Sequence, residues 1–197
     1  SLKDYFHKEN EGTFVFAFSG HGFSNSKGQN YLVTDDAELD DFENTALKLE
    51  DVTDLLLASN VRQKMVFIDA CRNNTGEKGA KSVGNPTSFS KLARLDASEG
   101  LGILFSTKQD TSSYEFSRID YDRKSFELFD NQSEGHGAFT YSLVNGLRGA
   151  ASTNDGLVTF NELSDYVQNQ VEDISLTMDR PVQLPFVSGE RRGDFLL

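Results

Sequence analysis

Residues 64–70, KMVFIDA, form a short run rich in β-branched and aromatic residues that leads directly into Cys71. Two similar runs are residues 13–19 (TFVFAFS), which end at Gly20, and residues 101–107 (LGILFST). None of the three alternates strictly between apolar and polar residues. Near-continuous apolar runs of this length are typical of strands that are buried on both faces of a parallel sheet. The sequence therefore predicts an α/β fold in which a mostly parallel central sheet lies between layers of helices.

The segments between and after these runs carry the patterns of covering helices. Residues 50–59 (EDVTDLLLAS) follow a weaker strand at residues 31–33 and place apolar side chains on one helical face, which gives a strand, crossover, strand unit. Residues 137–148 (GAFTYSLVNGLR) have apolar positions at helical spacing. Thr159 is followed three residues later by Glu162, a capping-box pattern that predicts the start of a further helix.

Length and composition indicate one domain that spans residues 1–197. A chain of 197 residues can bury a single sizeable core, and neither a repeat nor a linker interrupts it. The net charge of −12 opposes binding to nucleic acid and favours substrates that carry positive charge. No run approaches the roughly 18 apolar residues of a membrane span, and the start of the chain is polar. We therefore expect a soluble, cytoplasmic protein without a membrane partner.

Cys71 is the only cysteine of the chain, so its surroundings decide its role. A lone cysteine is either a buried small hydrophobe or a reactive thiol in a reducing compartment. Cys71 follows the strand at 64–70 in the turn DACR, and His21 follows the strand at 13–19 in the turn SGHG. Both residues therefore lie at carboxyl ends of parallel strands, the edge where such sheets bind ligands. They can meet in space although 50 positions separate them.

A thiol beside an imidazole is the arrangement that nucleophilic catalysis needs. The imidazole of His21 takes up the thiol proton, the thiolate of Cys71 attacks a carbonyl carbon, and the imidazolium later protonates the leaving amine. Glycines beside the histidine let the backbone approach a substrate closely, and the amides of Gly22 and Cys71 are candidates for the oxyanion hole. The structural alternative is a glycine turn with a capping histidine and, separately, a buried cysteine.

The two turns together resemble the catalytic turns of the caspase, metacaspase and paracaspase superfamily, the clan CD cysteine peptidases, whose histidine and cysteine lie about 50 residues apart in caspases. GAFT at residues 137–140, Asp155-Gly156 before a helix, and the ending at residues 183–195 are similar to the C-terminal half of bacterial caspase-like peptidases. The resemblance covers residues 13–197. It implies a caspase-like α/β/α sandwich, endopeptidase activity on proteins through the histidine and cysteine, and a regulated role in cell death or defence.

Asp69, two residues before the cysteine, is the candidate specificity residue. Side chains alternate along a strand, so Asp69 should lie on the same side of the strand end as Cys71. By resemblance, metacaspases carry Asp here and caspases that cut after aspartate carry Gln, and a carboxylate favours a guanidinium or ammonium group. The expected specificity is therefore cleavage after Arg or Lys, with Ser19 and Asp110 as further substrate-binding residues. The alternatives are a capping or salt-bridge role for Asp69 and a solvated loop position for Asp110.

No cofactor or metal is expected, and calcium is the open alternative. Metacaspases bind calcium through a cluster of aspartates, and the matching region offers Glu50 and Asp51 but Gln29 or Asn30 where another carboxylate would be wanted. The match to that site is incomplete. The acidic stretch at residues 35–43 could bind a hard cation, but such runs are usually solvated loops.

The superfamily normally has two strands and two helices before the histidine strand, whereas twelve residues precede it here. We expect N-terminal strands to be missing from this chain or supplied as a separate chain, because an open parallel edge invites aggregation unless something covers it.

Basic residues in the loop-like stretches 73–98 and 118–124 suit an enzyme that prefers Arg or Lys. We therefore expect zymogen processing there, by the protein itself or by an activating protease. The alternative is an ordinary solvated loop whose lysines aid solubility. His136 is assigned a structural or rim position.

Two other classes of function compete with a peptidase. An inactive caspase-like module would bind protein partners through the same cleft, although such modules often lose the dyad that is intact here. A flavodoxin-like nucleotide binder would need a glycine-rich phosphate loop between the first strand and a helix, and the sequence lacks one.

Overall fold

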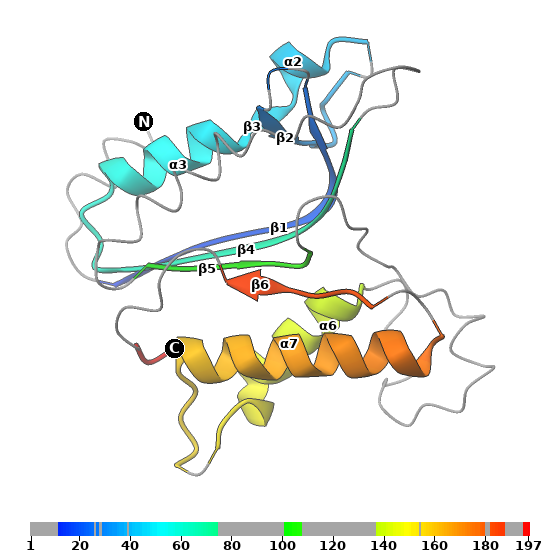
Figure 1. Cartoon of the computed structure of the whole chain (residues 1–197). Coiled ribbons are helices and arrows are strands. Elements are labelled where there is room, and N and C mark those ends of the chain that lie inside the picture. Colours follow the sequence, from blue (N-terminus) through cyan, green and yellow to red (C-terminus); the bar gives the residue numbers. More distant parts are fainter. Residues whose placement is uncertain are drawn as a thin grey trace.

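The computed structural model describes residues 12–25, 27, 29–38, 40–74, 101–107, 137–153, 155–179, 182–187 and 195–197. Within these residues the chain forms a six-stranded sheet in the order β3-β2-β1-β4-β5-β6 (Figure 1). The strands are β1 (Thr13–Ser24), β2 (Asn30–Leu32), β3 (Leu47–Lys48), β4 (Gln63–Asn74), β5 (Leu101–Phe105) and β6 (Phe186–Val187). The helical segments are α2 (Phe42–Thr45), α3 (Leu49–Ala58), α6 (Ala138–Asn145), the π-helical turn η1 (Gly146–Ala150) and α7 (Phe160–Thr177).

The three longer strands of the sheet are parallel to one another. β1 pairs with β4 from Thr13↔Gln63 to Ser24↔Asn74, and β4 pairs with β5. The short strands are antiparallel: β2 pairs with the end of β1, β3 pairs with β2, and β6 pairs with β5. The predicted α/β sandwich is confirmed, and its sheet is mixed because short antiparallel strands flank a parallel centre.

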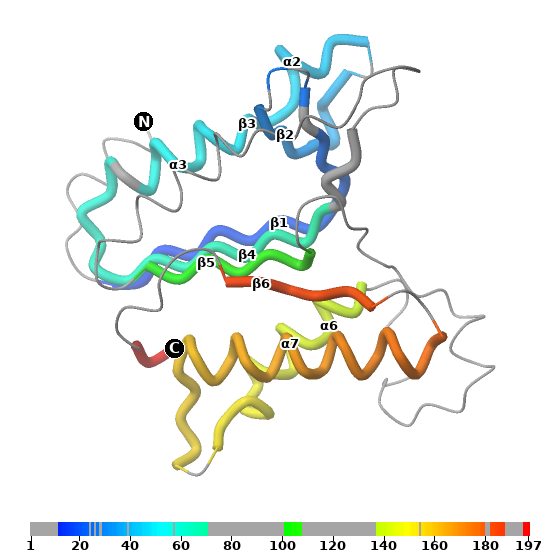
Figure 2. Tube along the Cα trace, in the orientation of Figure 1, coloured from blue at the N-terminus to red at the C-terminus, as the bar shows by residue number. Residues whose placement is uncertain are grey.

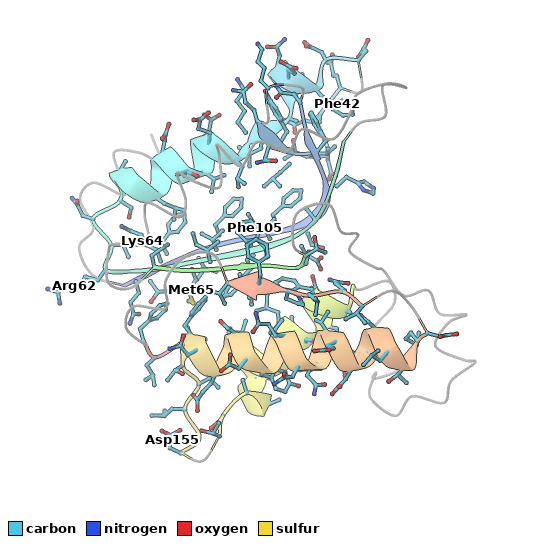
Figure 3. The ribbon with its side chains drawn as sticks, viewed as in Figure 1. Phe42, Arg62, Lys64, Met65, Phe105 and Asp155 are labelled. Atoms are coloured by element: carbon cyan, nitrogen blue, oxygen red, sulfur yellow. The ribbon has the colours of Figure 1, made fainter. Side chains whose placement is uncertain are left out.

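Helices cover both faces of the sheet: α3 lies on one face, and α6 and α7 lie on the other (Figure 1). The Cα trace shows β1, β4 and β5 running side by side between these layers (Figure 2). Alternation along β4 explains the two cores, because Val66 and Ile68 pack with α3 whereas Met65 and Phe67 pack with α6 and α7. In Figure 3 the ring of Phe105 lies on the α3 side of the sheet and Met65 lies on the α7 side.

β1 is covered differently from β4 and β5. Residues 65–70 of β4 and 102–105 of β5 are all buried. In β1, Phe14 packs into the core under α3, but the neighbouring Val15 is 52% exposed. The core formed with α6 and α7 contains residues of β4 and β5, and none of β1 among the described residues. Burial on both faces, expected for all three strands, is therefore confirmed for β4 and β5 and wrong for β1.

α7 begins at the predicted capping box. The hydroxyl of Thr159 accepts a hydrogen bond from the backbone N–H of Glu162 at 3.3 Å, and Glu162 Oε2 accepts one from the N–H of Thr159 at 3.0 Å. The hydroxyl of Thr153 donates to Glu162 Oε1 at 2.5 Å. The hydrogen bonds that Thr153 and then Thr159 donate to the carboxylate lower the pKa of Glu162. The segment that leads into α7 is therefore tied to the first turn of the helix.

Gly102 in β5 allows α7 to approach the sheet closely. A Cβ atom at this position would lie 2.5 Å from Cδ2 and 2.6 Å from Cζ of the Phe160 ring. Phe160 is 5% exposed, and its ring stacks on Phe195 with a centroid distance of 5.4 Å, so the ring cannot turn away freely. The first residue of α7 therefore rests directly against the backbone of β5.

Gly102→Ala is expected to lower the free energy of unfolding by about 1–3 kcal/mol, the usual cost of overpacking a core. Phe160→Leu alone also removes packing. The double variant should lose less stability than the two single losses added together, because the smaller side chain makes room for the new methyl group. Denaturant unfolding of the parent and the three variants measures this. Strictly additive losses would contradict the close approach.

Candidate active site

His21 and Cys71 are Cα partners in the parallel ladder between β1 and β4. The ladder keeps a constant offset of 50 positions, from Thr13↔Gln63 onward, so the residue opposite His21 is necessarily Cys71. Neighbouring strands lie about 4.8 Å apart. The backbone thus brings together the two residues that the sequence paired, at the carboxyl-terminal part of both strands.

A small hairpin supports β1 on the side away from β4. The carbonyl of His21 accepts a hydrogen bond from the N–H of Val33 at 2.8 Å, and Phe23 stacks on Tyr31 with a centroid distance of 4.9 Å. The side chain of Asn25 closes the turn, because its Oδ1 accepts the backbone N–H of Gln29 at 3.0 Å. The side chain of His21 itself is exposed, so an approaching group can reach it.

Gly22 follows His21 in β1 and has a Cα partner on each side, so that paired residues form a row across three neighbouring strands. Its partners are Arg72 in β4 and Leu32 in β2. The β1–β4 ladder extends beyond this row to Ser24↔Asn74. The amides of Gly22 and Cys71 thus lie in adjacent rows of the ladder, and their oxyanion role stays a prediction.

Asp69 is buried and contacts the start of α6. It is 6% exposed, and its Oδ2 accepts hydrogen bonds from the hydroxyl of Thr140 at 2.6 Å and from the Thr140 backbone N–H at 3.3 Å. Gly137, the N-cap residue of α6, has no side chain with which to cap the helix. Asp69 therefore caps α6 from the neighbouring sheet. The capping role, one of the two alternatives for Asp69, is therefore present in the structure. Its role in substrate binding stays a prediction.

Ser19 is the Cα partner of Asp69 in the ladder and is exposed. It therefore stands beside the buried carboxylate, two residues before His21. Asp110, the other predicted pocket residue, lies outside the described residues, as do His136 and the basic stretch at 118–124. Most of the predicted processing stretch at 73–98 also lies outside them.

The end of β5 is held next to Asp69 by buried polar contacts. The N–H of Ser106 donates to the carbonyl of Ile68 at 2.9 Å, and the side-chain amide of Gln183 donates to the carbonyl of Ser106 at 3.0 Å. Ser106 and Gln183 are both fully buried. This contact fixes the end of β5 against the residue that precedes Asp69.

Sequence reasoning missed Thr140 and Gln183. Both lie far along the chain from their partners, 71 and 77 residues away respectively, so no local pattern indicates the contacts. One signal was present for Thr140. A helix that starts after a glycine lacks a side-chain cap of its own, which indicates that another part of the chain supplies the acceptor.

Acidic residues near the hairpin are the candidates for a cation site. Among the described residues, no group of three or more His, Cys, Asp or Glu side chains could hold a metal ion. Glu50 and Asp51 occupy the first turn of α3, where negative charge stabilises the helix. The pKa of Tyr31 is raised, first by burial and then by the negative charges of Glu43, Glu50 and Asp51. These carboxylates therefore give this end of the sheet a negative potential.

Comparison with known proteins identifies the family of this chain. In the part of the chain that the structure describes, no helix is long and apolar enough to cross a membrane. No curated protein matches the sequence. A family model described as the caspase domain matches residues 1–196, almost the whole length of the sequence. This chain therefore belongs to the caspase domain family.

Proposed function

We propose that the protein is a cysteine endopeptidase that cleaves proteins after Arg or Lys, with His21 and Cys71 as its catalytic pair. Membership of the caspase domain family supports a cysteine peptidase with protein substrates. The observation that carries the assignment of residues is the pairing of His21 with Cys71 across two parallel strands. By resemblance to the superfamily, the setting is a zymogen of the cytoplasm with a role in cell death or defence.

The reaction follows from a thiol and an imidazole at neighbouring positions. His21 takes the thiol proton, and the sulfur of Cys71 attacks the carbonyl carbon of the scissile peptide bond. The negative charge that develops on the carbonyl oxygen is stabilised by the amides of Gly22 and Cys71. The C–N bond then breaks, and the imidazolium gives its proton to the leaving amine. Water hydrolyses the resulting thioester and restores the free thiol.

The preference for basic residues rests on charge. Asp69 places a carboxylate two residues before the nucleophile and next to the exposed Ser19. A buried carboxylate attracts a guanidinium or ammonium group strongly, because little water competes for it. The net charge of −12 adds a long-range attraction for basic substrates.

Fluorogenic peptides that end in Arg, Lys or Asp test the proposal directly. Peptides ending in Arg and Lys should be hydrolysed, and the peptide ending in Asp should not, because a carboxylate substrate is repelled by Asp69. An inactive binding module, the second candidate, would hydrolyse none of the three and would still bind a protein partner. Preferential cleavage after Asp would contradict the proposed specificity.

A further inference from the structure

The contact between Asp69 and Thr140 joins the predicted specificity residue to a helix on the other side of the core. Oδ2 of Asp69 accepts both the hydroxyl and the backbone N–H of Thr140. The hydroxyl contact of 2.6 Å is in the short range that is typical of a hydroxyl bound to an ionised carboxylate. Two donors on one oxygen define the rotation of the Asp69 side chain far better than one donor would.

α6 is a rigid support for these donors. Ala138 and Phe139, which precede Thr140, are 0% and 1% exposed, and Leu143 packs in the same core. Leu163 and Val167 of α7 belong to that core as well. Thr140 therefore cannot shift without disturbing a closely packed layer.

We propose that Thr140 is a positioning residue for substrate specificity, which fixes the carboxylate of Asp69 so that it meets the cationic side chain of the substrate. The inference rests on the proposed function and deepens it. The carboxylate can otherwise rotate about two side-chain bonds, and each unproductive rotamer weakens the bond to the substrate. Thr140 acts only through Asp69 and does not touch the substrate.

A purely structural cap predicts a different result. Losing the Thr140 hydroxyl would then lower stability and leave the discrimination between charged and uncharged substrates unchanged. The readout is therefore the ratio of kcat/KM for a peptide ending in Arg to kcat/KM for the same peptide ending in citrulline, which has the same shape without the charge. The unfolding midpoint of each variant is measured alongside.

Thr140→Val should lower the Arg-to-citrulline ratio about tenfold, as expected when the charge-assisted hydrogen bond that orients the acceptor is lost. The loss should appear mainly in KM. Thr140→Ser keeps the hydroxyl and should stay within about twofold of the parent. In the double variant Asp69→Asn/Thr140→Val, the ratio should fall no further than in Asp69→Asn alone, because the threonine works only through the carboxylate.

Thr53→Val is the matched control. Like that of Thr140, its hydroxyl donates a hydrogen bond, here to the carbonyl of Leu49 at 2.9 Å, but Thr53 is fully buried and lies in α3 on the opposite face of the sheet. Its removal should lower stability and leave the ratio unchanged. Thr140→Ala is the second variant for the same readout if Thr140→Val does not fold.

The outcomes separate this inference from the proposed function. If Asp69→Asn strongly lowers the Arg-to-citrulline ratio and Thr140→Val does not change it, the contact between Thr140 and Asp69 only caps α6, and the proposed function stands. If Asp69→Asn leaves the ratio unchanged, or if the parent hydrolyses no peptide, the assignment of Asp69 fails and the role of Thr140 fails with it.

Discussion

Cys71→Ala is expected to abolish peptide hydrolysis and to leave the fold intact. The change removes one sulfur atom, whereas the strand that carries it is held by the backbone ladder from Thr13↔Gln63 to Ser24↔Asn74. His21→Ala should lower kcat by at least about 10³-fold, since general base catalysis contributes up to about 10⁴-fold. The double variant should be no worse than Cys71→Ala, because the two groups act as a unit.

The single cysteine gives this prediction a second measurement. Iodoacetamide can alkylate no other thiol in the chain, so its rate of incorporation reports on Cys71 alone. At neutral pH the rate should be lower in His21→Ala than in the parent, because the imidazole favours the thiolate. Circular dichroism of both variants controls for the fold. Undiminished hydrolysis in either variant would exclude the assigned pair.

The parts of the fold that could be predicted from sequence were those with long local patterns. The runs at 13–19 and 64–70 lie within β1 and β4, residues 101–105 of the third run form β5, and the capping box at Thr159 precedes α7. The proximity of His21 and Cys71 was also predictable, because each follows one of the first two of these apolar runs. The predicted turns are wrong, however, since β1 and β4 continue through both residues to Ser24 and Asn74.

Other features of the sheet, namely the short strand β3, the direction of β2 and the exposure of β1, depend on contacts that no local sequence pattern indicates. β3 has two residues, which is too short for a periodic signal. The antiparallel direction of β2 follows from the turn at Asn25 and the stacking of Phe23 on Tyr31, both of which become evident only in the structure. The exposure of Val15 was likewise hidden, because α6 and α7 cover β4 and β5 rather than β1.

Asp69→Asn is the second change with a large expected effect. We expect kcat/KM for peptides ending in Arg to fall by about 10- to 100-fold, the loss that corresponds to about 1.5–3 kcal/mol for a hydrogen bond to a charged group. Asparagine is similar in size and retains one oxygen that can accept a hydrogen bond from Thr140. Glutamine would add a methylene group next to a buried helix start and is therefore the less clean test of charge.

Asp69→Ala separates the two roles of this residue. Alanine removes the substrate's partner and also the acceptor for the hydroxyl and N–H of Thr140, so it should lower the free energy of unfolding by about 1–3 kcal/mol more than asparagine does. Steady-state kinetics and denaturant unfolding of both variants give the comparison. If Asp69→Asn cleaves Arg and Lys peptides as well as the parent while Asp69→Ala is destabilised, Asp69 serves only to cap α6. The carboxylate that selects basic residues would then lie elsewhere in the chain.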